Sequence, residues 1–124
     1  MKPLKLTIST GDLTKPLDTD AGILYLLEME LEDRTLVKIG VTQRTRVEDR
    51  ICEILVSIWK RYRVFPKCVA KRYRTVDKVY EKEKYLHTVF SSDRYATKFV
   101  FSGSTEMFTT SLTDVVQAYD EITN

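Results

Sequence analysis

Hydrophobic and polar positions change their spacing several times along the chain, and each change predicts a different element. The run GILYLLEMEL from Gly22 to Leu31 is apolar and then alternates, and TLVKIGVT follows it from Thr35 to Thr42. The acidic pair Glu32 and Asp33 lies between the two runs. Two short runs of this kind around a turn predict a β-hairpin.

Two segments in the middle of the chain repeat their apolar residues at helical spacing. The first opens with Thr45 and Glu48 as a T-x-x-E capping box and predicts a helix that ends at about Trp59. The second predicts a helix from about Val76 to Phe90. The apolar stripes of these helices are Val47, Ile51, Ile54, Leu55 and Ile58 in the first, and Val76, Val79, Tyr80, Leu86 and Phe90 in the second.

The segments beside these helices have the character of strands and turns. Arg61 to Val76 has no helical period, contains Pro66 and alternates loosely, which predicts a third strand with a loop around it. A further strand is expected from Thr97 to Phe101, followed by a turn at Ser102, Gly103 and Ser104.

The end of the chain predicts a closing helix over residues 111–123. It begins with Ser111 and Asp114 as a second capping box, and its stripe is Leu112, Val115, Val116, Tyr119 and Ile122. Residues 1–20 are expected to form a peripheral N-terminal arm. The sequence therefore predicts an α+β fold for residues 21–124: a small, largely antiparallel three-stranded core sheet flanked by helices.

Composition narrows the class of protein. With 124 residues, 43% hydrophobic and 31% charged, the chain suits one compact domain. No apolar run approaches the roughly 20 residues of a membrane span, and the N-terminus lacks a signal peptide's apolar region, so we expect an intracellular, cytoplasmic protein without membrane contact. Cys52 and Cys68 form no CxxC pair, which argues against a disulfide framework or a zinc site and predicts two buried thiols.

Charge is unevenly distributed although its sum is only +2. Residues 34–98 contain 17 basic and 7 acidic residues, and Lys60 to Arg74 contains seven basic residues and no acidic one. Tyr62, Phe65 and Tyr73 lie among those cations. Cations interleaved with aromatic rings suit a polyanion such as nucleic acid, while a solvated edge of a small protein is an equal alternative.

Several polar residues break the local patterns. Glu83 lies where the second helix's period calls for an apolar residue, and His87, the only histidine, follows one turn later. A buried carboxylate is paired, metal-bound or directed into a cleft, so a structural ion pair and a functional site both remain open. Arg50 lies at the border of the first helix's stripe, where simple snorkelling is the common case. Lys38 faces opposite to its strand neighbours, and Tyr25 is expected to pack its ring with the hydroxyl at the rim.

Taken together, these residues resemble the GIY-YIG endonuclease superfamily, in particular its small phage and bacterial members with a C-terminal T-E-aromatic-F signature. Five short motifs occur in the family's order over residues 21–110. They are Gly22 with Ile23-Leu24-Tyr25, then Lys38-Ile39-Gly40, Arg50-Ile51, Glu83-Lys84-Tyr85-Leu86-His87, and FSGSTEMF from Phe101 to Phe108.

Three positions depart from the family's pattern. Lys38 stands where the second motif usually has tyrosine, and the first motif has its glycine one residue early. The family's late asparagine has no clear counterpart, and Glu106 lies near its place. The role of Glu106 is left open, with a structural turn residue as the favoured interpretation.

The resemblance implies a metal-dependent endonuclease that hydrolyses phosphodiester bonds in DNA with Mg²⁺ or Mn²⁺. Glu83 would hold the cation, and Arg50 would contact the scissile phosphate. Tyr25 would orient or deprotonate the attacking water, and Lys38 would favour the phenolate or contact a phosphate. His87 is a weaker candidate for a phosphate or leaving-group contact. Backbone-tracking cations would be Arg44, Arg46, Arg61, Arg63, Lys67, Lys71, Arg72 and Arg74.

The resemblance also implies a phage or mobile-element origin, with the host cytoplasm as the location. Sequence preference would come from loops, from a homodimer or from a partner protein. One alternative is a nucleic-acid-binding module that has lost catalysis and acts as a regulator or counter-defence factor. Another is a small protein-interaction domain for an acidic partner.

Overall fold

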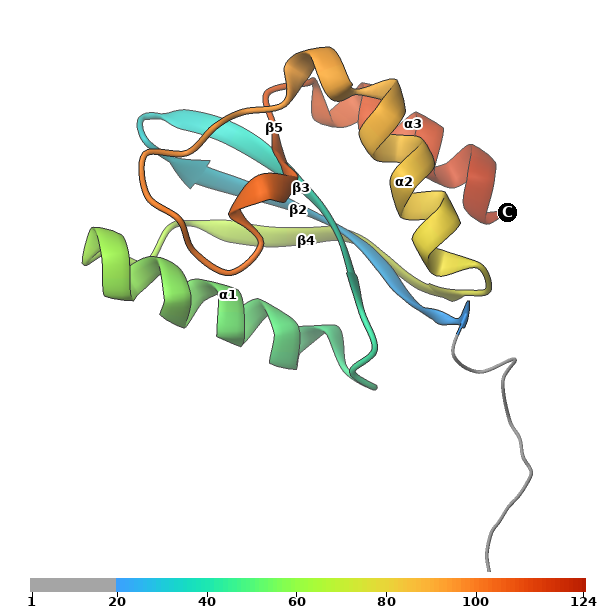
Figure 1. Ribbon diagram of the computed structural model, residues 1–124, viewed down its shortest axis with the longest axis horizontal. Helices are drawn as coiled ribbons and strands as arrows, with labels where there is room; N and C mark the ends of the chain where they lie inside the picture. The colour runs from blue at the N-terminus through green and yellow to red at the C-terminus, as the bar shows by residue number, and fades with distance from the viewer. Residues whose placement is uncertain (1–19) are drawn as a thin grey trace, which may run out of the picture.

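The computed structural model describes residues 20–124, so the arm expected over 1–20 lies outside the described part except for its last residue. The described residues form one antiparallel sheet with helices on both faces, which confirms the predicted α+β class (Figure 1). The strand order is β4-β2-β3-β5. The strands are β2 (Gly22–Leu31), β3 (Arg34–Thr42), β4 (Cys68–Val76) and β5 (Met107–Phe108).

The helices are α1 (Val47–Tyr62), α2 (Val79–Val89) and α3 (Leu112–Thr123), with short 3-10 turns η2 (Ser91–Asp93) and η3 (Ser104–Glu106). Figure 1 shows α1 under one face of the sheet and α2 with α3 on the other. In the described part of the chain, no helix has the length and apolar character needed to cross a membrane.

The predicted hairpin of β2 and β3 is confirmed, and its turn has an unusual backbone. Glu32 and Asp33 have φ values of 56° and 61°, in the left-handed region that a two-residue hairpin turn requires and that Asn or Gly usually occupies. The Glu32 carboxylate accepts hydrogen bonds from the hydroxyls of Tyr62 and Tyr95 and from the Lys98 amide. These contacts hold the turn against α1 and the loop after η2.

Alternation along β2 divides the core into two layers. Tyr25, Leu27 and Met29 face α1, where they pack with Ile54 and Ile58 of that helix. Leu24 and Leu26 face the other layer, built from residues of β3, β5, α2 and α3: Val37, Ile39, Val79, Leu86, Phe108, Val115 and Tyr119. The central strand β2 is therefore covered on both sides, which explains its long apolar run.

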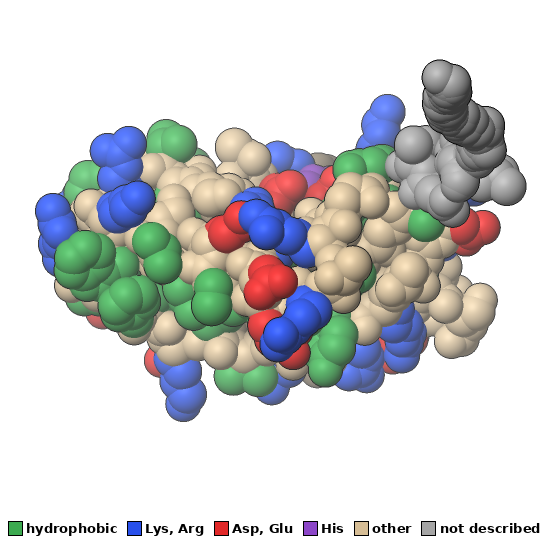
Figure 2. Space-filling model, turned by 90° about the horizontal axis from the view of Figure 1, so that it is seen from below, with side chains coloured by type: hydrophobic (Ala, Val, Ile, Leu, Met, Phe, Trp, Pro, Cys, Tyr) green, Lys and Arg blue, Asp and Glu red, His purple; other side chains and the backbone are tan. Residues whose placement is uncertain are grey.

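Helix α1 confirms the predicted helix but differs at its start. Its N-cap is Arg46, which makes no side-chain cap hydrogen bond, so the expected capping box of Thr45 and Glu48 is wrong. Cys52 lies on the outer surface of α1 and is exposed, and Cys68 is half-buried, so the expectation of two buried thiols is also wrong. Figure 2 shows acidic and basic side chains intermingled at the centre of the surface on the α1 side.

The expected strand over Thr97–Phe101 is wrong. Those residues form no ladder, and the edge of β3 is paired instead by Met107 and Phe108, opposite Lys38 and Val37. The pairing extends through an isolated bridge between Arg94 and Phe108. Residues 95–106 thus form a loop that leaves the sheet after the Arg94 bridge and returns to it at Met107, which pairs with β3.

The two remaining helices match their predictions apart from one boundary. Helix α2 begins at Val79 because Val76 is still paired with Gly22 in β4, and Tyr80 is exposed instead of facing the core. Helix α3 begins as expected, since the Ser111 hydroxyl accepts a hydrogen bond from the Asp114 amide.

Candidate active site

Tyr25 lies on the α1 face of β2, opposite Gly40 of β3. A Cβ atom at position 40 would lie 2.5 Å from the ring and hydroxyl of Tyr25, so glycine at this position is required by the ring that lies across it. The hydroxyl is buried and makes no hydrogen bond of normal geometry among residues 20–124, although the Arg50 guanidinium lies beside it. The expectation of a hydroxyl at the rim is therefore wrong, because α1 and the loop over residues 101–106 cover this face.

Lys38 pairs with Leu27, two positions along the hairpin from Tyr25 and Gly40, and so lies on the same face as Tyr25. As its alternation predicted, it faces opposite to Val37 and Ile39. Its side chain is 0% exposed. The ammonium pairs with the Glu106 carboxylate, lies 3.4 Å from the Gly103 carbonyl oxygen, and lies 5.6 Å from the centroid of the Tyr25 ring. A buried ammonium requires such an anion, and Glu106 supplies it.

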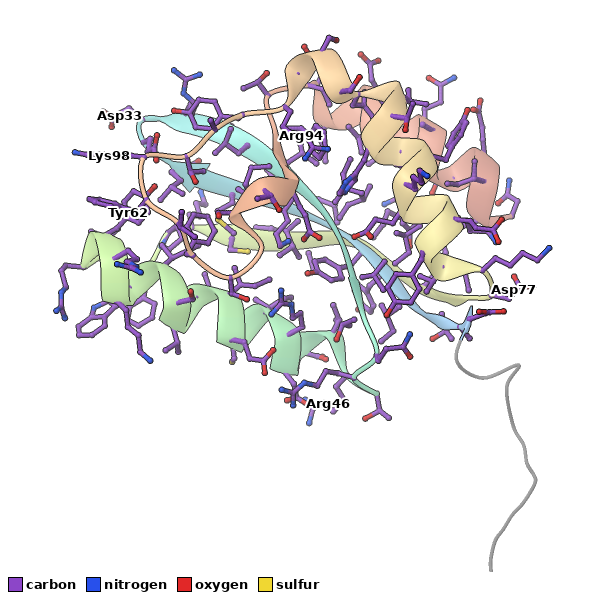
Figure 3. All side chains as sticks on the ribbon, viewed as in Figure 1. Asp33, Arg46, Tyr62, Asp77, Arg94 and Lys98 are labelled. Carbon is purple, nitrogen blue, oxygen red and sulfur yellow. The ribbon has the colours of Figure 1, made fainter. Side chains whose placement is uncertain are left out.

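The turn that carries Glu106 is shaped around Lys38. Gly103 has a φ of 81°, and a Cβ atom there would overlap the Lys38 ammonium. Glu106 ends η3 and directly precedes Met107, which pairs with Lys38 in the sheet. Arg94 donates to the Thr105 carbonyl oxygen at 2.8 Å, and Figure 3 shows Arg94 beside this turn. Strand pairing thus places the Glu106 carboxylate at the Lys38 ammonium.

Arg50 approaches the same turn from α1. Its guanidinium donates to the Ser102 hydroxyl at 2.8 Å and lies 3.4 Å from the Glu53 carboxylate. The Ser102 amide in turn donates to the Ser57 hydroxyl at 2.8 Å. Arg50 is half-buried, so its guanidinium retains a surface that an anion can reach.

Glu83 approaches from α2 and is 17% exposed. His87, one turn later, donates its Nε2 hydrogen to the Ile39 carbonyl oxygen at 2.9 Å and packs its ring 5.2 Å from that of Phe108. That carbonyl belongs to the edge of β3 just beyond its pairing with β5. His87 therefore holds α2 on this edge, and the Glu83 carboxylate lies 4.0 Å from its Nε2 atom.

Burial shifts the pKa of three ionisable groups in this cluster. It raises the pKa of Tyr25 to about 12, and the neighbouring Arg50 guanidinium only partly opposes this. It lowers the pKa of Lys38, which the Glu106 carboxylate opposes. Burial together with the Glu106 charge raises the pKa of Glu83 to about 7, although Lys38 acts in the other direction. Glu83 is therefore poised between its protonated and ionised forms near neutral pH.

The loop that carries this turn is also fixed at its far end. Figure 3 shows Asp33, Lys98 and Tyr62 at the same end of the molecule, where Glu32 accepts its three hydrogen bonds. The donors come from α1 and from the loop, and the acceptor comes from the hairpin turn, three segments that are distant in sequence. The turn over 101–106 is thus anchored on both sides of the site.

The donor set limits the metal that the cluster fits. Among residues 20–124 there is no group of three His, Cys, Asp or Glu side chains that could hold a metal ion. Glu83 and Glu106 provide two neighbouring carboxylates. Such a pair does not fit zinc, which takes three or four protein ligands, but it fits Mg²⁺, which one or two carboxylates bind with several waters.

The proposed backbone-tracking cations fall into two groups. Arg61, Arg63 and Lys67 are exposed and form no ion pair within the described residues. The others have carboxylate partners, in the pairs Arg44 with Glu53, Arg46 with Glu48, Lys71 with Glu28, and Arg72 and Arg74 with Asp120. The continuous basic stretch of the sequence is therefore divided in the fold.

The structure brings together Tyr25, Lys38, Arg50 and Glu83 from four elements, with His87 at the border of the group. It also places Glu106 and Ser102 beside them. The sequence left the role of Glu106 open, with a structural turn residue favoured, and in the structure Glu106 is the ion partner that the fully buried Lys38 requires. Ser102 binds Arg50, and no sequence signal indicated that contact.

Comparison with known proteins identifies a domain family. No curated protein and no solved structure matched the chain. The family model of the T5orf172 domain, a domain found in nuclease-like proteins of phages and bacteria, matches residues 22–123. This range contains every residue of the cluster, and the chain belongs to the T5orf172 domain family.

Proposed function

We propose that this protein is a metal-dependent DNA endonuclease of the GIY-YIG type, encoded by a phage or mobile element. The observation that supports it most is the buried Tyr25 hydroxyl, which has no partner in the described residues and lies near Arg50, Glu83 and Glu106. A buried polar group without a partner costs stability and is typical of a site that binds something else. Membership in a nuclease-associated family supports the same class of activity.

In this proposal Glu83 holds Mg²⁺ or Mn²⁺, with Glu106 as the neighbouring carboxylate. The bound cation supplies positive charge that offsets the charge developing on the phosphoryl oxygens. Glu83 is suited to this role because it is 17% exposed, so it is shielded from bulk water but still reachable. Near pH 7 the protonated and ionised forms of Glu83 are close in energy, and a bound cation favours the ionised form.

Tyr25 orients the attacking water through its hydroxyl. With a pKa of about 12 the phenol is neutral near pH 7, which favours hydrogen bonding over prior deprotonation. Arg50 binds the scissile phosphate, exchanging its contact with the Ser102 hydroxyl for a phosphate oxygen. Its planar fork of donors matches two phosphoryl oxygens and stabilises charge that increases in the transition state.

Lys38 and His87 act as positioning residues in this scheme. Lys38 is fully buried and paired, so it holds Glu106 at the site and leaves phosphate binding to Arg50. His87 uses Nε2 to bind the Ile39 carbonyl oxygen, which fixes α2 and hence Glu83 on the edge of β3.

The test is a cleavage assay with Mg²⁺ on supercoiled plasmid and on labelled linear and branched DNA. Glu83→Gln and Arg50→Ala are each expected to reduce cleavage at least about a hundredfold while DNA binding and folding persist. Glu81→Gln is the matched control, because Glu81 is an exposed carboxylate on the same helix. It should cleave as the parent protein does.

The opposite outcome has an equally clear meaning. If the parent protein cuts none of these substrates but binds them in a salt-sensitive manner, the endonuclease proposal is wrong. The protein would then be a nucleic-acid-binding module without catalysis, the alternative that the sequence left open.

A further inference from the structure

The end of α1 carries an exposed pair of aromatic rings that the proposed reaction does not use. Trp59 and Phe65 stack with their ring centroids 6.1 Å apart and an angle of 20° between the rings. They remain 38% and 63% exposed. The Arg63 guanidinium lies 4.8 Å from the centroid of the Trp59 ring. Figure 2 shows hydrophobic side chains gathered at one end of the surface on the α1 side, with Lys and Arg side chains beside them.

The backbone at this end favours the same arrangement. Arg63 follows the last turn of α1 with a φ of 61°, and its amide donates to the Trp59 carbonyl oxygen at 2.8 Å. Glycine is the usual residue in this left-handed position because it has no Cβ atom. An arginine there accepts an unfavourable backbone conformation and places its guanidinium on the aromatic pair.

The charges around the rings have no partners in the described part of the chain. Lys60, Arg61, Arg63 and Lys67 form no ion pair there, in contrast to Arg72 and Arg74, which both contact Asp120. An uncompensated basic group attracts a polyanion. It disfavours a second copy of this chain, because a twofold interface would bring the same cations together.

The aromatic pair is connected to the candidate active site along α1. Arg50 and Trp59 are about 14 Å apart along the helix axis, on different sides of the helix. Between them lies a depression of about 440 Å³ lined by Cys52, Glu53, Val56, Ser57 and Lys60. Its one carboxylate, Glu53, contacts both Arg44 and Arg50, which offsets its charge. A strand held at Arg50 can therefore continue obliquely across α1 to the rings.

We propose that the Trp59–Phe65 pair binds an unpaired strand of nucleic acid by stacking on its bases. Bases inside a duplex have both faces covered, so exposed rings can stack on unpaired bases but not on bases within a duplex. If the protein cuts DNA as proposed above, its substrate class is DNA in which a single-stranded stretch adjoins the cleaved phosphodiester bond. That last step rests on the proposed function, whereas the binding itself does not.

The experiment uses Trp59 as its own reporter, because it is the only tryptophan in the chain. Its fluorescence is measured with EDTA present, so that no metal-dependent cleavage occurs. The probes are an oligodeoxynucleotide of about 12 nucleotides, the same backbone with abasic sites, and the blunt duplex of the same sequence. We expect saturable quenching by the single strand and little by either of the other two.

Two variants separate stacking from charge. Phe65→Leu keeps the reporter and should weaken binding of the single strand about tenfold, the loss typical of one stacked base. Tyr85→Leu is the matched control, since Tyr85 is 53% exposed on α2, and it should bind as the parent does. Equal quenching by the abasic probe would overturn the proposal in favour of charge alone.

A second copy of the chain is the competing occupant. Sedimentation that shows a dimer, lost in Phe65→Leu, together with an absence of quenching by the single strand, would assign the rings to self-association and overturn the proposal. The outcomes also separate this inference from the endonuclease. Quenching without cleavage on any DNA contradicts only the endonuclease, and cleavage without quenching contradicts only the stacking site.

Discussion

Two buried tyrosines on neighbouring segments of the core show how differently this fold treats similar groups. Tyr119 of α3 and Tyr25 of β2 are both fully buried, and burial raises the pKa of each to about 12. Tyr119 donates its hydroxyl to the Leu24 carbonyl oxygen at 2.6 Å. The Tyr25 hydroxyl has no partner within residues 20–124. The raised pKa is common to both, and the hydrogen bond is what distinguishes them.

The surroundings of the two tyrosines differ in the same way. Beside Tyr119, the Asp120 carboxylate contacts Arg72 and Arg74, and the hydrogen bond from Arg72 lowers the pKa of Asp120. Around Tyr25, the pKa of Glu83 is instead raised to about 7. One region pairs its polar groups and joins α3 to β4. The other leaves the Tyr25 hydroxyl without a partner and raises the pKa of Glu83, which is expected where a substrate or cation completes the site.

The largest contrast is expected from removing each hydroxyl. Tyr25→Phe should reduce cleavage by about 10² to 10⁴, because a group that orients the attacking water is lost. Its stability should be unchanged or up to about 1 kcal/mol higher, since a buried hydroxyl without a partner is removed. Tyr119→Phe should lose about 1 kcal/mol of stability and keep its cleavage rate. Urea denaturation and the plasmid assay measure the two effects.

The reverse pattern would remove the distinction between the tyrosines. If Tyr25→Phe lowers stability as much as Tyr119→Phe and leaves cleavage intact, then Tyr25 is part of the core and the candidate site is misassigned. Circular dichroism of both variants checks that the fold is preserved.

A second contrast concerns the pH dependence of stability. Because the folded pKa of Glu83 is about 7, above its ordinary value of 4.5, the folded state binds the proton more tightly than the unfolded state. The contribution of Glu83 to the free energy of unfolding is therefore greatest below about pH 4.5 and is lost as the pH rises towards 7. Glu83→Gln removes the titration and should be stabilised at pH 8, relative to the parent, by up to about 3 kcal/mol.

Urea denaturation in EDTA at about pH 5 and about pH 8 measures this difference. The parent should lose stability between the two values, and Glu83→Gln should lose less. Glu81→Gln again serves as the control and should follow the parent. Parallel curves for the parent and Glu83→Gln would show that Glu83 is not strained in the folded protein.

The smallest effect is expected from the paired region. Asp120→Asn removes the carboxylate that contacts Arg72 and Arg74, but all three groups are partly exposed and screened by solvent. The loss of stability should be smaller than that of Tyr119→Phe and should vanish in about 1 M sodium chloride. A loss of cleavage in Asp120→Asn would contradict a purely structural role for this region.

Much of the fold could be predicted from local patterns. The hairpin, α1, β4, α2 and α3 follow from apolar spacing, since period 2 and period 3.6 place side chains on one face of a strand or a helix. The failures are local as well. Thr97–Phe101 is rich in residues that favour strands, yet Met107 and Phe108 pair with β3, because only one segment can occupy that edge. A capping motif at Thr45 is present in the sequence, but α1 begins two residues later.

The sequence by itself indicated the candidate site residues. Tyr25 lies in the first strand, Lys38 faces opposite to its strand neighbours, Glu83 stands where the helix period calls for an apolar residue, and Arg50 lies at the border of a helix. Only the tertiary structure decided how they are partnered. Glu106 forms an ion pair with Lys38 and lies near Glu83. Asp120 forms ion pairs with Arg72 and Arg74. Periodicity records which way a side chain faces, whereas ion pairs between residues distant in sequence depend on strand register and helix packing.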